Sequence, residues 1–252
     1  MAPLLEVIDI KKSFGSLRAL DGVTLSVESK KVSILIGPNG SGKTTLINVI
    51  SGFYTPDSGR VIFDGKEITG LPPYELYDTG IARTFQIPNL FWKLTALENV
   101  QVAEKGNPGE SFIRTLLRRS WAKEEARATE KAFRLLNLLG LSRVWDKQAV
   151  TLSGGQMKLL ELGRVLMSGA KLVLLDEPIS GVNPTLAHEI FGRILKLRDE
   201  LGVTFLIVEH RLDIALTYVD TVTAMAFGKV VAGGKPELVM ADPKVIEAYL
   251  GA

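Results

Sequence analysis

The chain has 252 residues, of which 46% are hydrophobic and 23% are charged. That length and balance suit one large folded core, or a core with a subdomain, and argue against global disorder. Lysine and arginine number 30 against 28 aspartates and glutamates, so the net charge gives no reason to expect nucleic acid or an acidic membrane as a partner. The absence of cysteine excludes disulfides, thiolate metal sites and cysteine nucleophiles.

The hydropathy pattern predicts no membrane-spanning segment. No apolar run reaches about 18 residues, and the N-terminus meets Glu6 too early for a signal peptide. We therefore expect a soluble chain that reaches any membrane through a partner.

Expected strands dominate the first part of the chain. Short alternating runs extend over 4–32, with Asp21-Gly22 read as a turn. Residues 59–63 followed by Asp64-Gly65 predict a hairpin. The sequence therefore predicts a β-rich entry region.

Residues 37–44 read Gly-Pro-Asn-Gly-Ser-Gly-Lys-Thr, which matches the phosphate-loop pattern G-x-x-x-x-G-K-[ST]. They lie between the apolar run 32–36 and the helix-compatible run 45–50, the context that this motif requires. The glycines let backbone N–H groups surround a polyphosphate, Lys43 reaches the β- and γ-phosphates, and Thr44 offers its hydroxyl to Mg²⁺. A plain glycine-rich turn has no reason to carry Lys-Thr there. The residues expected to hold the nucleotide are Gly37, Pro38, Asn39, Gly40, Ser41, Gly42, Lys43, Thr44 and Thr45.

The middle of the chain has a helical pattern between 95 and 141, with a linker-like stretch at 105–109. Within it, the apolar residues Phe112, Ile113, Leu116, Leu117 and Trp121 recur at three- and four-residue spacing. After residue 153, helical and strand runs alternate, which predicts a parallel sheet covered by helices. These runs are 158–167, 172–176, 185–201, 204–208 and 222–227.

A pair of acids follows a continuous apolar run at 172–175, as expected for a strand buried on both faces. Asp176 suits coordination of Mg²⁺, and Glu177 suits positioning a water for attack on the γ-phosphate. Two solvated acids opening a loop are the alternative, which the phosphate loop disfavours. The sequence therefore predicts Mg²⁺-dependent hydrolysis of a nucleoside triphosphate.

Between these two motifs stands the segment Leu152-Ser153-Gly154-Gly155-Gln156. With the three motifs in this order, the chain resembles the nucleotide-binding subunit of an ATP-binding-cassette (ABC) transporter over essentially its whole length. The resemblance implies an α/β fold: a P-loop NTPase core with an antiparallel β subdomain (1–94 and 151–252) and an α-helical subdomain carrying a family insertion (95–150).

The resemblance also implies roles for single residues. Ser153, Gly154, Gly155 and Gln156 would face the γ-phosphate of ATP held by a second subunit, although Ser153 also suits an ordinary helix N-cap. Gln86 would touch Mg²⁺ and the attacking water, and His210 the γ-phosphate. Phe14 would stack on adenine, with a plain packing role as the alternative.

Two further positions have simpler expectations. His188 lies off the apolar stripe of its expected helix and is expected at the surface. Asn183 stands where many cassettes have aspartate, and it caps the helix that begins at Pro184 equally well.

Longer features, at 80–86, 97–100, 104–130 and 242–251, resemble the ATPase subunits of branched-chain amino acid importers. Related urea or amide importers and lipopolysaccharide exporters stay open as alternatives. A soluble non-transport ABC ATPase is disfavoured because such proteins usually carry two cassettes or a long coiled-coil insertion, and intact Glu177 and His210 argue against an ATP sensor without turnover. The resemblance implies ATP and Mg²⁺ as cofactors. It implies as partners an identical or paralogous ATPase subunit, integral membrane permease subunits and, indirectly, a solute-binding protein, with no nucleic acid. It implies a cytoplasmic location on the inner face of the cell membrane, through the permease.

Overall fold

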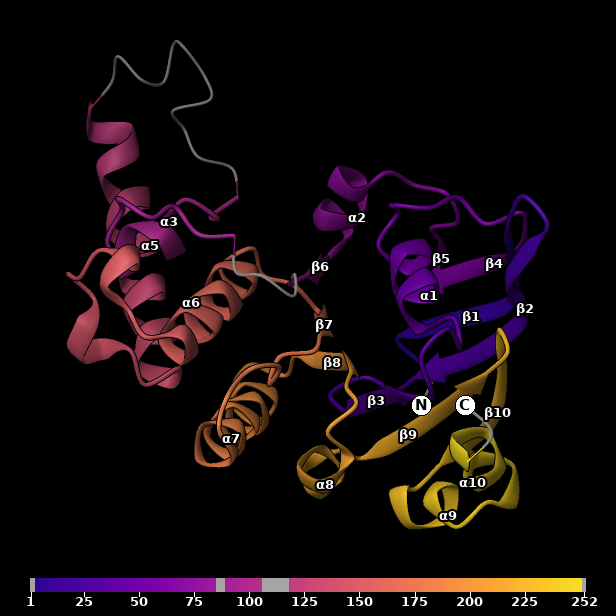
Figure 1. The fold of residues 1–252 in the computed structure, drawn as a ribbon. Helices are drawn as coiled ribbons and strands as arrows, with labels where there is room; N and C mark the ends of the chain where they lie inside the picture. The colour runs from indigo at the N-terminus through magenta and orange to yellow at the C-terminus, as the bar shows by residue number, and fades with distance from the viewer. Residues whose placement is uncertain (1–2, 85–88, 106–117, 251–252) are drawn as a thin grey trace. The chain divides into compact units, whose positions relative to one another are not determined.

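The computed structural model describes residues 3–84, 89–105 and 118–250, without the side chains of 118–123. It divides into two compact units, Met1–Gln86 with Lys171–Ala252, and Ile87–Ala170 (Figure 1). Compactness does not by itself define functional subdomains, so the boundaries at 95 and 150 stay a prediction. Within the described residues, no helix combines the length and apolar character needed to cross a membrane.

The first unit contains a four-stranded sheet in the order β2-β1-β4-β5. All three of its strand pairs are antiparallel. The pairing of β4 with β5 confirms the predicted hairpin at 59–65. The strands are β1 (Leu5–Phe14), β2 (Leu17–Val27), β4 (Ser58–Phe63) and β5 (Lys66–Glu67).

The predicted turn at Asp21-Gly22 is wrong, because both residues lie inside β2. Asp21 pairs with Lys11 and Val23 pairs with Ile10, so the register shifts between them. Gly22 has a φ of +81°. The Asp-Gly pair therefore forms a bulge in a long strand, a conformation that uses the same glycine freedom as a turn.

The second sheet has six strands in the order β10-β9-β3-β8-β7-β6. All neighbours are parallel except β10, which runs antiparallel to β9. Every residue of β3 and β8 is buried, and residues 172–175 of β7 are buried as their continuous apolar run predicts. The strands are β3 (Val32–Ile36), β6 (Ile81–Arg83), β7 (Leu172–Asp176), β8 (Thr204–Val208), β9 (Thr221–Ala226) and β10 (Lys229–Gly234).

Because β3, β8 and β7 are neighbours, their carboxyl ends share one edge of the sheet, where ligands of such folds bind. The helix that follows β3 is α1 (Lys43–Ile50), anchored by the buried Leu46, Ile47 and Ile50. The other helices of this unit are α2 (Pro73–Thr79), α7 (Pro184–Leu201), α8 (Leu212–Ala215), α9 (Pro236–Met240) and α10 (Pro243–Leu250) (Figure 1).

The second unit is helical, with α3 (Ala96–Gln101), α5 (Arg118–Leu138) and α6 (Gly154–Met167). The helical pattern predicted between 95 and 141 is confirmed over α3 and α5. The apolar residues at 112–117, most of the linker-like stretch and the side chain of Trp121 lie outside the described residues. Fully buried Asn99 bonds the Phe91 amide and the carbonyls of Phe91, Leu94 and Thr95, which fixes the loop before α3.

Candidate nucleotide-binding and hydrolysis site

The loop at 37–42 joins the buried strand β3 to α1, which confirms the strand, loop and helix context of the phosphate motif. Its backbone requires glycine at two places. Gly37 and Gly42 have φ of +148° and +103°, and a Cβ would lie 2.1 Å from the Met225 carbonyl oxygen or 2.7 Å from that of Ala19. Close backbone approach therefore shapes the loop.

Lys43 is held over this loop by three acceptors. Its Nζ donates to the carbonyl oxygens of Gly37 at 2.7 Å and Pro38 at 2.9 Å, and to the Ser41 hydroxyl at 3.3 Å. Burial lowers the pKa of the Lys43 ammonium, while the negative charges of Glu177 and Asp176 oppose that shift. The Lys43 ammonium is therefore partly buried and interacts electrostatically with Glu177 and Asp176.

The N-terminus of α1 suits an anion. Its N-cap is Gly42, and within the described loop and helix no side chain caps it. The first-turn N–H groups of a helix lack intrahelical acceptors, and the helix dipole adds positive potential there. Thr44 is exposed and Thr45 half-buried in this turn. These N–H donors fit a polyphosphate. The Thr44 hydroxyl and the Asp176 carboxylate are oxygen ligands of the kind that Mg²⁺ takes together with phosphate oxygens.

Asp176 ends β7, and Glu177 follows it with a φ of +50°, a strained value for a residue with a side chain. The Glu177 amide donates to the Val208 carbonyl at 2.9 Å, which ties it to the end of the neighbouring strand β8. His210 Nδ1 lies 3.6 Å from Glu177 Oε1. The structure therefore brings together Glu177 and His210, which are far apart in the sequence.

Sequence reasoning missed Glu209, whose side chain is fully buried. Its Oε1 accepts from the Ile179 amide at 2.9 Å, and its Oε2 from the amides of His210 at 3.1 Å and Arg211 at 3.4 Å. This carboxylate joins the segment after Glu177 to the segment that carries His210. An acid directly after the mainly apolar run 204–208 was the available signal.

Sequence reasoning also missed Arg83, the last residue of β6. Its Nη2 donates to Asp176 Oδ2 at 3.0 Å, and its Nη1 donates to Asn48 Oδ1 at 2.5 Å. No short motif contains it, and only the pairing of β6 with β7 brings it to Asp176.

Phe14 ends β1 with 43% of its surface exposed. Its ring meets that of Tyr54 edge-on at 5.2 Å between centroids, and Lys12 Nζ lies 5.6 Å from its centroid. Asp57 holds the strand end by accepting from the Ser13 amide at 2.6 Å and from Lys12 Nζ at 3.0 Å. The exposed ring is available for stacking, and its adenine role stays a prediction.

The signature segment lies in the second unit, where Ser153 is the N-cap of α6. The Ser153 hydroxyl accepts from the Gln156 amide at 3.3 Å, and the Ser153 amide donates to Gln156 Oε1 at 2.9 Å. This capping box confirms the N-cap interpretation of Ser153. The phosphate role of Ser153, Gly154, Gly155 and Gln156 stays a prediction.

Three other predicted positions have plain outcomes. Gln86 lies outside the described residues. His188 is exposed, as expected, and its Nδ1 lies 2.8 Å from the Tyr218 hydroxyl. Asn183 caps α7 by accepting from the Leu186 amide at 2.9 Å, which confirms its capping role.

Comparison with known proteins matches residues 20–180 to the ABC transporter family and residues 229–252 to the branched-chain amino acid ATP-binding cassette transporter family. A solved ATP-binding cassette of an ABC transporter in its ADP conformation is 48% identical with a TM-score of 0.87, and the match covers 100% of both chains. The cbiO1 protein of Clostridium perfringens is 28% identical with a TM-score of 0.84, covering 98% of this chain and 94% of that one. The chain belongs to the ABC transporter family, as one of its nucleotide-binding ATPases.

Within that family, the chain groups with the branched-chain amino acid transport ATP-binding proteins. The probable protein of this kind from Archaeoglobus fulgidus, LivG, is 51% identical over 99% of this chain and 96% of its own length. The high-affinity protein BraF of Pseudomonas aeruginosa is 39% identical, over 99% of this chain and 98% of its own length. LivG of Escherichia coli is 34% identical over the same shares.

Proposed function

We propose that the chain binds and hydrolyses ATP to drive import of branched-chain amino acids through a membrane permease. The full-length similarity to branched-chain amino acid transport ATP-binding proteins carries this proposal. The match of residues 229–252 to the cassette family of those transporters supports the amino acid importer over urea, amide or lipopolysaccharide transport.

The geometry of the phosphate loop supports ATP as the ligand. The loop amides and Lys43 take the β- and γ-phosphates, since the ammonium already lies among loop oxygens at 2.7–3.3 Å. Thr44, Asp176 and Gln86 would hold Mg²⁺, which would supply positive charge to neutralise the phosphates. Phe14 stacks on the adenine.

Glu177 orients the attacking water and accepts its proton as the water oxygen bonds to the γ-phosphorus, while the bond from the γ-phosphorus to the bridging oxygen breaks and ADP leaves. His210, 3.6 Å from the Glu177 carboxylate, contacts the γ-phosphate. Glu209 holds the backbone that carries both residues and takes no part in the chemistry. The strained φ of Glu177 supports a functional role, because such backbone angles persist where surrounding contacts impose them.

Two ATPase subunits then work as a clamp. Ser153, Gly154, Gly155 and Gln156 of each subunit face the γ-phosphate held by the other, so ATP joins the two and hydrolysis releases them. Gln86 and the adjoining residues up to Phe91 pass this motion to the permease, and the subunit works at the cytoplasmic face of the membrane. The second subunit is an identical or a paralogous chain.

The test compares wild type with Glu177→Gln by light scattering and phosphate release, with and without Mg²⁺-ATP. We expect hydrolysis to fall by about 100-fold or more in Glu177→Gln, while ATP produces a stable dimer. Glu189→Gln, which alters an exposed ion pair on α7, is the matched control and should behave as wild type. A Glu177→Gln protein that stays monomeric in Mg²⁺-ATP, both alone and mixed with the paralogous ATPase subunit of its transporter, contradicts the clamp.

The transported solute needs a separate measurement. The chain is reconstituted in vesicles with the permease and solute-binding protein of its own transporter, and uptake of leucine, urea and an amide is compared. We expect ATP-dependent leucine uptake alone. Uptake of urea or an amide without leucine contradicts the amino acid proposal and leaves the ATPase intact.

A further inference from the structure

Arg83 joins three elements of the first unit at one guanidinium. It ends β6, an edge strand that pairs with β7, and its side chain is only 10% exposed. One terminal nitrogen, Nη2, donates to Asp176 Oδ2 at 3.0 Å. The other, Nη1, donates to Asn48 Oδ1 at 2.5 Å and to the Ser51 hydroxyl at 3.2 Å. The fork therefore links the acid at the end of β7 to the helix that follows the phosphate loop.

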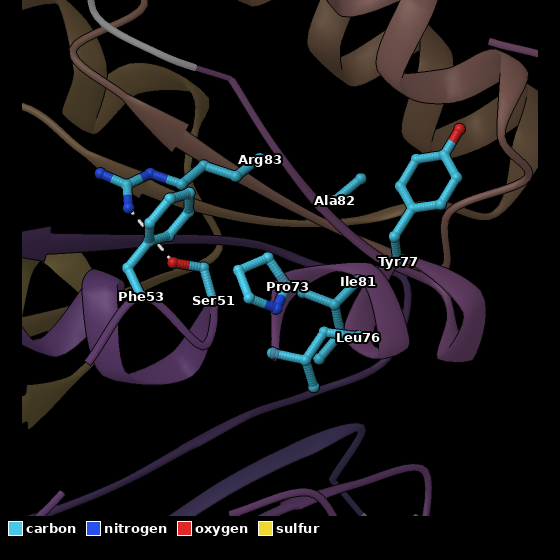
Figure 2. Close-up of a pocket in the computed structure, with 8 residues that line it drawn as sticks. All are labelled: Ser51, Phe53, Pro73, Leu76, Tyr77, Ile81, Ala82 and Arg83. Carbon is cyan, nitrogen blue, oxygen red and sulfur yellow. Dashed lines mark hydrogen bonds between the residues drawn. The ribbon is translucent and has the colours of Figure 1, made fainter. Parts of the chain in front are cut away.

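The surroundings of Arg83 restrain it further. The Phe53 ring centroid lies 5.6 Å from Arg83 Cζ, and Figure 2 shows the ring against the guanidinium with the Ser51 hydroxyl pointing toward it. The guanidinium borders a cavity of about 150 Å³ whose other walls are mainly apolar, formed by Phe53, Pro73, Leu76 and Ile81. Apolar neighbours lower the local dielectric and strengthen the charge-assisted hydrogen bonds of Arg83.

A purely stabilising role explains this arrangement poorly. A buried ion pair adds little net stability, because desolvation of both charges offsets their attraction. The pair instead fixes an orientation. A carboxylate whose one oxygen accepts a hydrogen bond from a fixed guanidinium cannot rotate freely, so its other oxygen keeps one direction. Residues that hold a metal ligand in this way tune metal affinity without touching the metal.

We propose that Arg83 is a positioning residue that orients the Asp176 carboxylate for Mg²⁺ and couples it to α1 through Asn48 and Ser51. This inference rests on the proposed role of Asp176 as a Mg²⁺ ligand. Lysine cannot replace Arg83, because a single ammonium cannot bond Asp176 and the α1 acceptors with the geometry of a planar fork. Arg83→Lys, which keeps the charge and loses the fork, should therefore raise the Mg²⁺ concentration that the protein requires.

The experiment titrates Mg²⁺ against binding of a fluorescent ATP analogue and against phosphate release. For Arg83→Lys we expect the Mg²⁺ concentration at half-maximal signal to rise about tenfold in both assays, while analogue binding in EDTA stays within about twofold of wild type. Arg198→Lys is the matched control, because Arg198 also bridges two acids, Asp199 and Asp220, in the same unit. Its Mg²⁺ dependence should equal that of wild type.

If Arg83→Lys lowers the melting temperature as Arg198→Lys does but leaves the Mg²⁺ dependence unchanged, Arg83 is only structural and the inference is overturned. If Arg83→Lys does not fold, Asn48→Ala decides in its place: a rise of about threefold in the Mg²⁺ requirement supports the inference, and no rise overturns it. A wild type that does not bind Mg²⁺-ATP overturns the proposed function as well, whereas an unchanged variant of an active protein overturns the inference alone.

Discussion

The N-termini of α1 and α6 are both expected to meet phosphate, yet they are built differently. The α1 terminus has Gly42 as its N-cap at a φ of +103°, with no side-chain cap among the described residues. The α6 terminus has Ser153 at an ordinary extended φ of −67°, closed by a reciprocal capping box with Gln156. In the described part of the chain no side chain competes with a ligand for the α1 amides, whereas at α6 the Ser153 hydroxyl and the backbone amides of Ser153 and Gln156 already have partners in the capping box.

From this difference we expect the α1 terminus to bind ATP in a single subunit and the α6 terminus to act when two subunits close. A terminus shaped by glycine and covered by Lys43 suits tight binding by the isolated subunit. In the proposed clamp, the capped α6 terminus keeps its helix stable in the monomer and engages phosphate only when a second subunit presents it. Substitutions at both termini, and at the strand end that carries Phe14, test this division of roles.

Lys43→Ala should lower the affinity for ATP about 100-fold, because charge-assisted hydrogen bonds to two phosphates are lost. Equilibrium binding of a fluorescent analogue measures this. Lys171→Ala, which removes an exposed ion pair with Asp64 in the same unit, is the control and should bind as wild type. Equal affinity of Lys43→Ala and wild type for the ATP analogue would contradict phosphate binding by Lys43 at the α1 terminus.

Alanine should have opposite effects at the two termini. Gly42→Ala should lower the free energy of unfolding by about 2 kcal/mol, because its φ is unfavourable and its Cβ would lie 2.7 Å from the Ala19 carbonyl oxygen. Gly154→Ala meets no atom within 4 Å and should keep or raise stability, by at most about 1 kcal/mol. Urea unfolding without nucleotide measures both, and equal losses contradict the comparison.

Ser153→Ala should lower the free energy of unfolding by about 1 kcal/mol through loss of the N-cap. Thr95→Ala is matched to it, because Thr95 and Glu98 form the same capping box on α3. We expect similar melting temperatures for the two variants. In the Glu177→Gln background only Ser153→Ala should also weaken the ATP-dependent dimer, measured by light scattering; equal dimerisation would make Ser153 a cap and nothing more.

Asp57→Asn should have a small, pH-dependent effect. Hydrogen bonds from Lys12 and from Ser13 hold the pKa of the Asp57 carboxyl below its usual 3.8. Since the folded-state pKa is the lower one, the contribution to stability is complete above the unfolded-state pKa and is lost as pH falls through the folded-state pKa. The melting temperatures of wild type and Asp57→Asn should therefore begin to converge as pH falls below about 5 and meet below the folded-state pKa.

The same substitution tests the adenine end of the site. Because Asp57 holds the strand end that carries Phe14, Asp57→Asn should raise KM for ATP by no more than about threefold. Asp64→Asn is its control, since Lys171 lowers the pKa of that exposed acid in the same way, away from Phe14. An equal rise in KM for both variants argues against a link between Asp57 and Phe14.

Local patterns predicted much of the fold because they reflect local physics. The continuous apolar run at 172–175 became the buried part of β7, and the runs expected as strands at 32–36 and 204–208 became β3 and β8. Asn183 caps α7 as its side chain allows. The turn predicted at Asp21-Gly22 was wrong. The Asp-Gly pair indicates only that the backbone tolerates a positive φ, and a bulge requires that property as a turn does. Local preference cannot distinguish the two, because the choice depends on the partner strand β1.

Local sequence patterns identified the class of the protein and predicted the residues that would meet phosphate, because the glycine loop, the signature and the paired acids are contiguous segments with local chemistry. The groups that hold these residues in place follow from the tertiary fold. Arg83 reaches Asp176 across 93 positions because β6 lies beside β7, and Glu209 joins the segments that carry Glu177 and His210 because β8 lies beside β7. Such pairings depend on strand order and register, which no local pattern specifies.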